Sequence, residues 1–321
     1  MSRKLVVWIP ELADTLNRKI SAKAESLGFE TVFPESREAA EQAAAEAEIL
    51  LTQDSALVRK APKLRWVCTP SAGVDHFLAP GCFANPEAVL TNSSGAYGVT
   101  IAEHVIMVTL EMMRRRAEYS EIVRERRWER GLHIHAIHGS RAALLGTGDI
   151  GRECAKRLRA FRPASLTGIN RRGGNPEGLF DRVLTVDRLE EVLPETDLLI
   201  LSLPDTKETR GVMSAERLAM LPETAYLVNV GRGSALDQKA LEGMLRNGKL
   251  AGASLDVFEK EPVPPEDSLW ECPGLLMTPH IAGNMTLDYT VETIIGQFLE
   301  DLDRYAAGKP PARTVDRERA Y

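Results

Sequence analysis

The stretch RAALLGTGDIGRECAKRLRAF, residues 141–161, decides the fold of this chain. Apolar residues fill its first part, a G-x-G-x-x-G pattern follows, and a helix-forming run completes it. A strand that turns through such glycines into a helix is typical of a dinucleotide-binding unit, where the pyrophosphate lies at the helix N-terminus. The alternative is a tight turn without a ligand. We expect cofactor contacts at Gly146, Thr147, Gly148, Asp149, Ile150 and Gly151.

Strand-like runs alternate with helical runs on both sides of this stretch. Downstream strands are expected in SLTGIN (165–170), DLLILSLP (197–204), AYLVNV (225–230), GASLDVF (252–258) and LLMTPH (275–280). Upstream strands are expected in LVVWI (5–9), EILLT (48–52), LRWVCT (64–69) and VLTN (89–92). The alternation predicts an α/β protein with two doubly wound parallel sheets.

Helices are expected between these strands. The sequence indicates them at 35–48, at about 100–116, in KALEGMLRN between a capping Asp237 and Gly248, and after about Thr286. In the second of these, the spacing predicts one apolar face formed by Ile101, Val105, Val108 and Met112.

The end of the strand after the glycine pattern bears on the choice of cofactor. An acidic residue at this place usually binds the adenosine ribose and repels a 2′-phosphate. Here the chain reads Asn170-Arg171-Arg172, an uncharged amide followed by two guanidinium groups. This pattern favours NADP over NAD, with NAD still possible; the alternative is a charged, solvated turn.

Composition excludes several classes of protein. The 321 residues carry 40 Lys and Arg against 46 Asp and Glu, a net charge of −6, which disfavours binding to nucleic acid or to an anionic membrane. Arg114–Arg130 holds seven Arg and four Glu, which indicates a solvated or subunit-facing surface. Four scattered cysteines without a C-x-x-C pair indicate reduced thiols, and HIHAIH at 133–138 lacks the partners of a metal site, so we expect no metal. No membrane span and no leader are evident, so we expect a cytoplasmic protein.

Several ordered motifs resemble those of the D-isomer-specific 2-hydroxyacid dehydrogenase family. They are SAGVDH (71–76), YGVTIAEHV (97–105), GTGDIG (146–151), VNVGRGSALD (228–237), LDVFEKEP (255–262), TPHIAG (278–283) and the closing TVDRERAY (314–321). The resemblance implies a Rossmann cofactor domain, residues 99–286, inserted into a flavodoxin-like substrate domain, residues 1–98 plus 287–321.

The resemblance also implies that Arg232, Glu261 and His280 are catalytic. These residue types suit the reduction of a 2-oxo acid. A planar guanidinium can bind the carboxylate and polarise the carbonyl, an imidazole can supply the proton, and a carboxylate beside it favours the charged imidazole.

Other roles follow from the same resemblance. It implies that the backbone amides around Ala72 and Gly73 hold the substrate carboxylate and that Asp256 binds the nicotinamide carboxamide. It assigns further cofactor contacts to Leu203, Pro204, Val230, Gly231 and Gly283.

The sequence thus predicts an NADP-preferring oxidoreductase, a 2-oxo acid reductase of the glyoxylate or hydroxypyruvate type that works as a homodimer. One alternative is an NAD-dependent member of the family, similar to phosphoglycerate dehydrogenases. The other is a dinucleotide-sensing interaction protein of the corepressor type, which would bind the dinucleotide without turnover.

Overall fold

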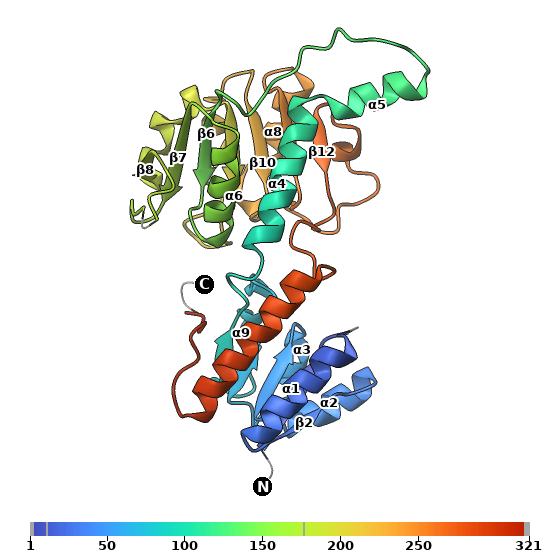
Figure 1. Cartoon of the computed structure of the whole chain (residues 1–321), viewed down its shortest axis with the longest axis vertical. Helices are drawn as coiled ribbons and strands as arrows, with labels where there is room; N and C mark the ends of the chain where they lie inside the picture. The colour runs from blue at the N-terminus through green and yellow to red at the C-terminus, as the bar shows by residue number, and fades with distance from the viewer. Residues whose placement is uncertain (1–2, 11, 176, 318–321) are drawn as a thin grey trace. The chain divides into compact units, whose positions relative to one another are not determined.

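The computed structural model describes residues 3–10, 12–175 and 177–317 (Figure 1). The last four residues of the TVDRERAY motif lie outside this range. The chain divides into two compact units, Met1–Tyr97 with Met285–Tyr321, and Gly98–Asn284. Within the described ranges, no helix combines the length and apolar character that a bilayer crossing requires.

The first unit contains a five-stranded parallel sheet in the order β2-β1-β3-β4-β5. This order is the flavodoxin-like one, as the sequence predicted. Its strands are β1 (Arg3–Trp8), β2 (Phe29–Val32), β3 (Ile49–Thr52), β4 (Trp66–Cys68) and β5 (Val89–Thr91). The edge strand β2 was not predicted.

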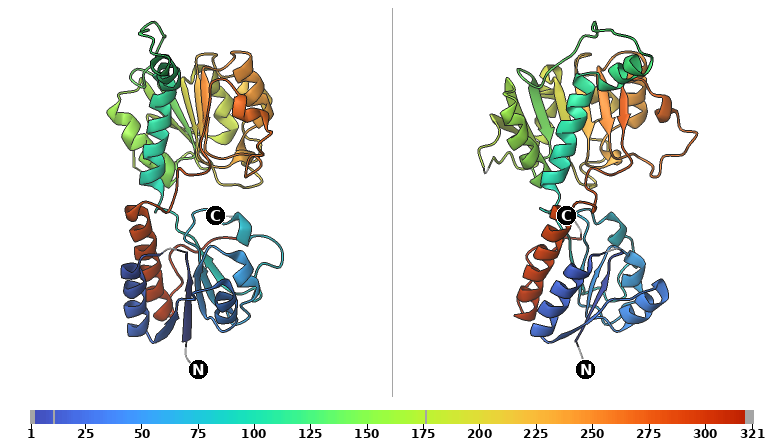
Figure 2. Two further views of the ribbon diagram at one scale, coloured as in Figure 1. Left: turned by 90° about the vertical axis from the view of Figure 1, so that its right-hand side faces the viewer. Right: turned by 45° about the vertical axis from the view of Figure 1, so that its right-hand side comes forward.

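Helices cover both faces of this sheet (Figure 2). On one face α1 (Asp14–Ser26) lies beside α9 (Asp288–Ala306), and on the other lie α2 (Arg37–Ala45) and α3 (Ser55–Arg59). A short 3-10 turn, η1, spans Asp75–Phe77. The C-terminal helix α9 packs into the core, because Phe298 stacks on the fully buried Trp66 with ring centroids 5.3 Å apart. The two ends of the chain therefore build one unit.

The second unit contains a seven-stranded parallel sheet in the order β12-β11-β10-β9-β6-β7-β8. The strand order reverses between β6 and β9, as in a Rossmann fold, which confirms the predicted fold class. The strands are β6 (Arg141–Leu145), β7 (Ser165–Asn170), β8 (Arg182–Thr185), β9 (Leu198–Leu201), β10 (Tyr226–Asn229), β11 (Gly252–Leu255) and β12 (Leu275–Met277). The edge strand β8 was not predicted.

Helices α4 (Gly98–Met113) and α6 (Asp149–Ala160) contact each other on one face of this sheet, while α7 (Ala215–Leu218) and α8 (Gln238–Arg246) pack on the other. The cap of α8 is as predicted, since Asp237 accepts a hydrogen bond from the amide of Ala240 at 2.9 Å. On α4, however, Met113 rather than Met112 is buried. The described part of the unit also contains helix α5 (Arg116–Arg124) and the 3-10 helices η2 (Val186–Glu191), η3 (Leu193–Glu195), η4 (Gly233–Ala235) and η5 (Ser268–Glu271).

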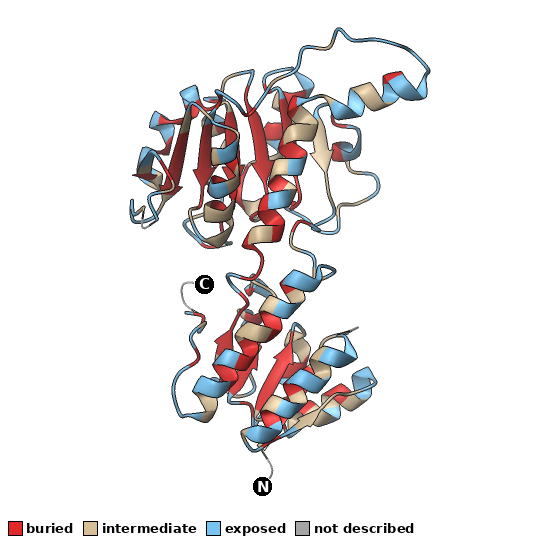
Figure 3. Ribbon diagram, in the orientation of Figure 1, coloured by how far each residue is buried: buried red, intermediate tan, exposed pale blue. Residues whose placement is uncertain are grey.

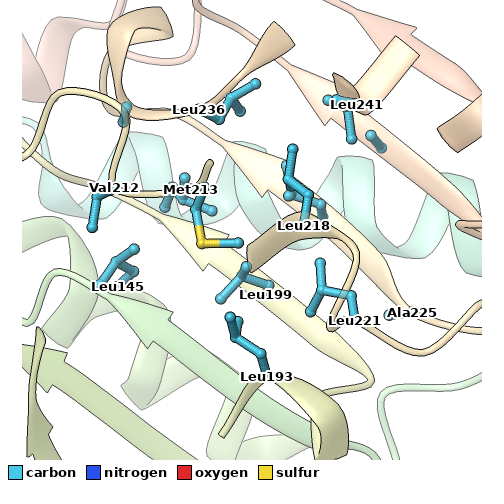
Figure 4. Close-up of a cluster of buried hydrophobic side chains, with 14 of the residues drawn as sticks. Leu145, Leu193, Leu199, Val212, Met213, Leu218, Leu221, Ala225, Leu236 and Leu241 are labelled. Carbon is cyan, nitrogen blue, oxygen red and sulfur yellow. The ribbon is translucent and has the colours of Figure 1, made fainter. Parts of the chain in front are cut away.

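Buried side chains fix the strands of the second unit. Strands β9, β10 and β11 are buried along their whole length (Figure 3). Leu199, Leu218 and Leu241 belong to one apolar cluster that joins the sheet to α7 and α8 (Figure 4). Because this core is close-packed, the loops that leave the strands start from fixed positions.

Candidate active site

Close contacts account for two of the three glycines in the turn between β6 and α6. Gly146 has φ +107°, and a Cβ there would lie 2.8 Å from the carbonyl oxygen of Ser202. A Cβ on Gly151 would lie 2.1 Å from the carbonyl oxygen of Gly146, so helix and strand could not approach as they do. A Cβ on Gly148 would meet nothing within 4 Å. The turn therefore has no room for a side chain at Gly146 or Gly151, whereas the space beside Gly148 is open.

The N-terminus of α6 is suited to a phosphate group. Its N-cap residue is Gly148, and no side chain caps the helix. The Asp149 carboxylate lies against Gly98 at the start of α4 and accepts a hydrogen bond from its backbone. Burial raises the pKa of Asp149, and the bond from Gly98 opposes that rise. First-turn amides without a side-chain cap, beside an open glycine, fit the pyrophosphate of a dinucleotide. Ile150 is half-buried in the same turn of helix.

The Asn170 side chain organises the turn after β7. Its Nδ2 donates to Thr147 Oγ1 at 2.7 Å and to the carbonyl oxygen of Gly174 at 2.9 Å. Its Oδ1 accepts from the amides of Arg172 at 2.9 Å and Gly173 at 2.6 Å. Both amide hydrogens and the oxygen are therefore in use. In this structure Asn170 thus sets the shape of the turn, and a contact of Asn170 with the cofactor stays a prediction.

Arg171 and Arg172 are both exposed on this turn. Hydrogen bonds from its own backbone and from Thr206 lower the pKa of Glu208, and the positive charge of Arg171 adds to that effect. The positive charge of Arg171 therefore acts on Glu208, which lies in the loop that follows β9. The two arginines bring positive charge to the place where an acidic residue would repel a 2′-phosphate.

The ends of β9 and β10 are in direct contact. Leu203 is 9% exposed and Pro204 after it is exposed. On the neighbouring strand, Val230 is 6% exposed, and a Cβ on Gly231 would lie 2.6 Å from the backbone nitrogen of Leu203. Gly231 therefore permits a close approach of the two backbones, and Ser202, next to Leu203, lies against Gly146 of the glycine-rich turn that follows β6.

Arg232 leaves the sheet between two tightly packed glycines. A Cβ on Gly233 would lie 1.9 Å from the carbonyl carbon of Phe258, so this position excludes any larger residue. Asn229 Nδ2 donates to the Arg232 carbonyl oxygen at 3.0 Å, and its Oδ1 accepts from the Gly231 amide at 3.1 Å. The guanidinium donates to the Gly231 carbonyl at 2.8 Å. The Arg232 backbone is thereby fixed at the carboxyl end of β10.

His280 and Glu261 form a hydrogen-bonded pair. His280 Nδ1 lies 2.7 Å from Glu261 Oε2, and Glu261 Oε1 accepts a hydrogen bond from the amide of Phe258 at 2.9 Å. The side chains are 50% and 35% exposed, so a ligand can reach the imidazole. A carboxylate on Nδ1 fixes the ring orientation and leaves Nε2 as the outer nitrogen.

Asp256 positions the loop that carries His280. It is 2% exposed and accepts hydrogen bonds from Thr278 Oγ1 at 2.6 Å, the Ile281 amide at 2.9 Å and the Ala282 amide at 3.0 Å. His280 between these residues has φ +55°, a conformation that the surrounding hydrogen bonds must hold. A nicotinamide carboxamide that binds Asp256, as expected, would donate to a carboxylate that already accepts three hydrogen bonds. Gly283, which follows Ala282, is half-buried.

Two residues of this network were not predicted as functional. Thr278 precedes Pro279 and His280, and its Oγ1 lies 3.4 Å from His104 Nε2 on α4. Burial lowers the pKa of His104, and the negative charge of Asp256 opposes that effect. Both residues lie within motifs quoted above, TPHIAG and YGVTIAEHV, but their contact joins residues 174 positions apart. A linear pattern carries no signal for such a contact.

The predicted residues of the second unit share one edge of its sheet. Gly146, Asn170, Leu203, Arg232, Asp256 and His280 all lie at or just after the carboxyl end of a strand. Because the strands are parallel, these ends form a single edge, the usual ligand side of an open α/β sheet. Ala72 and Gly73 belong to the first unit, where they follow β4 at the carboxyl edge of that sheet.

A Rossmann unit with an open glycine turn and a histidine–carboxylate pair at one edge defines a nicotinamide-dinucleotide-dependent dehydrogenase. Residues 106–282 match the model of the NAD binding domain of D-isomer specific 2-hydroxyacid dehydrogenases. The chain belongs to this family and is an oxidoreductase. It is 30% identical over 286 residues to the glyoxylate/hydroxypyruvate reductase B of Escherichia fergusonii, covering 86% of this chain and 87% of that protein.

Solved structures agree with this assignment. A D-isomer specific 2-hydroxyacid dehydrogenase family protein from Aeromonas salmonicida has a TM-score of 0.89 and 31% identity, covering 99% of this chain and all of that one. A second family member, from Xanthobacter autotrophicus, was solved in complex with NADPH and MES. It has a TM-score of 0.83 and 29% identity, with full coverage of both chains.

Proposed function

We propose that this protein is an NADPH-preferring reductase of small 2-oxo acids, of the glyoxylate or hydroxypyruvate type. The observation that carries the proposal is the 2.7 Å pair of His280 Nδ1 and Glu261 Oε2, on the sheet edge that also bears the open glycine turn. The name of the Escherichia fergusonii relative supports the substrate class, and the NADPH-bound structure from Xanthobacter autotrophicus supports the cofactor.

In this proposal the second unit binds the cofactor. The N-terminus of α6 and Gly148 hold its pyrophosphate, Arg171 and Arg172 attract its 2′-phosphate, and Leu203 with Pro204 lies along it. When bound, the nicotinamide supplies the hydride that reduces the substrate carbonyl at C2.

His280 supplies the proton for the carbonyl oxygen. Glu261 holds Nδ1, so Nε2 is the nitrogen that donates during reduction and accepts during oxidation. Asp256 keeps the loop of residues 278–282 in place and so keeps the imidazole at a fixed position.

Arg232 binds the substrate as an anion. Its planar guanidinium donates to the carboxylate and to the carbonyl oxygen, on which negative charge develops as the bond is reduced. The first unit is the substrate domain in this proposal. Its backbone amides at Ala72 and Gly73 are the carboxylate donors that the family resemblance implies.

A reductase assay with glyoxylate, hydroxypyruvate, pyruvate and a bulkier 2-oxo acid, each with NADPH and with NADH, tests the function. We expect turnover of the small acids, with a lower KM for NADPH. His280→Asn should abolish turnover and keep NADPH binding, whereas His138→Asn, at an exposed position of the same unit, should be active. Dinucleotide binding without any turnover would favour an interaction protein, and a preference for NADH would favour the NAD-dependent alternative.

We also propose that the protein is a cytoplasmic homodimer. Helix α5 (Arg116–Arg124) and the loop after it extend beyond the sheet of their own unit (Figure 1). They expose Val123, Trp128 and Ile134 by 71%, 91% and 41%, and a second copy would cover this apolar surface. All four cysteines are free, which suits a reducing compartment. Light scattering should give a dimer, and Trp128→Ser should weaken it.

A further inference from the structure

The loop that follows β4 has an unusual arrangement of backbone carbonyl groups. Five consecutive carbonyl oxygens, from residue 69 to residue 73, accept hydrogen bonds from inside the same unit. The donors are the Ser93 hydroxyl to residue 69 at 3.0 Å, the Tyr97 hydroxyl to residue 70 at 2.6 Å and the Ser93 amide to residue 71 at 3.0 Å. Asn92 Nδ2 donates to residue 72 at 2.7 Å, and the Ser71 hydroxyl donates to residue 73 at 2.8 Å.

Four of the five hydrogen bonds come from residues 92–97, and the residues that donate them are buried. Asn92, Ser93 and Tyr97 are 7%, 1% and 6% exposed. Burial raises the pKa of Tyr97 to about 12, so its hydroxyl is a donor near neutral pH. These donors act as a fixed template for the loop.

Peptide geometry then sets the direction of the amide groups. The peptide bonds of this loop are trans, and in a trans peptide the C=O of one residue and the N–H of the next point in opposite directions. Because the carbonyls of Ser71 and Ala72 point to the segment 92–97, the N–H groups of Ala72 and Gly73 point away from it. In the part of the chain that the structure describes, neither of these N–H groups donates a hydrogen bond, and both residues are half-buried rather than covered.

We propose that Tyr97 and Asn92 are positioning residues for the substrate carboxylate. This inference rests on the proposed function. The two side chains never touch the substrate. Asn92 holds the carbonyl oxygen of Ala72 and so directs the N–H of Gly73, while Tyr97 holds the carbonyl oxygen of Pro70 and so fixes the start of the loop. Together with the Ser93 amide, which holds the Ser71 carbonyl and so directs the N–H of Ala72, they keep two neighbouring amide donors pointing away from the segment 92–97, and binding does not have to order the loop first.

The substitutions Tyr97→Phe and Asn92→Ala test the proposal. Each removes one donor, so we expect the KM for glyoxylate to rise about 3- to 10-fold, the effect of one lost hydrogen bond. The inhibition constant of oxalate, which carries the carboxylate but no reducible carbonyl, should rise by the same factor. We expect kcat, its pH profile and the Kd of NADPH to stay within about twofold of wild type.

The matched control is Tyr305→Phe. Tyr305 belongs to the same unit, its hydroxyl donates to Glu48 Oε1 at 2.9 Å, and burial raises its pKa to about 12 as well. This variant also loses one hydrogen bond of the unit, but it should keep the wild-type KM. A similar rise in KM for Tyr97→Phe and Tyr305→Phe would show a general loosening of the unit and overturn the proposal.

Wild-type turnover separates this inference from the proposed function. If the wild type reduces glyoxylate and a folded Tyr97→Phe or Asn92→Ala variant keeps its KM, the positioning role is wrong and the function stands. If the wild type reduces none of the four 2-oxo acids, the function is wrong and the inference falls with it. Should Tyr97→Phe fail to fold, Asn92→Ala decides.

Discussion

Asn170 Nδ2 donates a hydrogen bond to Thr147 Oγ1 over 2.7 Å. This bond joins the turn after β7 to the glycine-rich turn after β6, so the segment expected near the 2′-phosphate and the segment expected near the pyrophosphate move together. The same side chain fixes the amides of Arg172 and Gly173. Within this turn, Asn170 holds the backbone conformation through hydrogen bonds, and Arg171 and Arg172 supply positive charge.

Removing the arginines should change cofactor preference. Arg171→Ala or Arg172→Ala should raise the KM for NADPH about 10- to 100-fold, since a charge-assisted hydrogen bond contributes roughly 1.5 to 3 kcal/mol, and leave the KM for NADH unchanged. Added salt should weaken the wild-type preference, because both arginines are exposed. Asn170→Asp combined with Arg171→Ala should invert the preference toward NADH. Steady-state kinetics with both cofactors measure these effects.

The control for this series is Lys249→Ala. Lys249 is an exposed cation in the same unit, paired with Glu223 at 2.6 Å, and it precedes β11 at the opposite, amino edge of the sheet. It should not affect either KM. Equal KM values for NADPH and NADH in the wild type would show that Arg171 and Arg172 form only a charged turn.

The pair of His280 and Glu261 should set the rate of the reaction. Glu261 Oε2 lies 2.7 Å from His280 Nδ1 and so orients the imidazole. Glu261→Gln should lower kcat about 10- to 100-fold in both directions, because the charged partner that fixes the ring is lost, and it should leave the Kd of NADPH unchanged. Initial rates of reduction and of oxidation test this. A folded variant with the wild-type kcat would contradict a coupling of the two side chains.

Arg232→Lys should impair both binding and chemistry. A lysine ammonium is a point charge and cannot donate to a carboxylate and a carbonyl oxygen in one plane. We expect kcat/KM to fall by an amount equivalent to about 2 to 4 kcal/mol, the usual effect of losing one preorganised donor. The Kd of NADPH, measured by fluorescence titration, should not change. Wild-type kinetics in a folded variant would remove Arg232 from the site.

Acid should weaken the first unit at Glu48. Burial acts to raise the pKa of Glu48, but hydrogen bonds from Arg3 at 2.8 Å and from Tyr305 at 2.9 Å outweigh it and hold the pKa below its usual value. A lowered folded-state pKa stabilises the fold above the unfolded-state pKa, and this contribution is lost as pH falls through the folded-state value. Glu48→Gln should therefore cost about 1 to 2 kcal/mol near neutral pH and less in acid.

The free energy of unfolding of the wild type and of Glu48→Gln, measured with denaturant from neutral to acidic pH, tests this prediction. Glu46→Gln is the control, because Glu46 pairs with Lys63 at 2.5 Å but is 54% exposed, and exposed pairs contribute little. A stability difference for Glu48→Gln that does not narrow toward low pH would contradict the linkage.

Most strands were predictable because they are buried on both faces. Strand β9, Leu198–Leu201, is buried throughout and reads as an unbroken apolar run. The two missed strands, β2 and β8, are edge strands whose sequences FETV and RVLT each bury one residue. Helix α1 also gave a weak signal, since it buries only Ile20 and Ala24 among 13 residues. Elements with little buried surface leave little trace in the sequence pattern.

The site was predictable as far as its motifs reach. The glycine turn and the placement of Arg232 and His280 after strands followed from local patterns. The hydrogen bonds of Asn170 and Asp256 did not, because Thr147 lies 23 residues from Asn170, and the amide of Ile281 lies 25 residues from Asp256. Which hydrogen bonds occupy a side chain depends on folded neighbours that spacing alone does not specify.

Loops along the common carboxyl edge of the second sheet are free to change in evolution. The residues proposed for cofactor and proton transfer stand on segments that begin where buried strands stop, while the strands and the apolar cluster behind them hold the scaffold. A loop along this edge can be exchanged without disturbing the packing that stabilises the unit. New substrate ranges can therefore arise by small insertions and replacements, at low risk to folding.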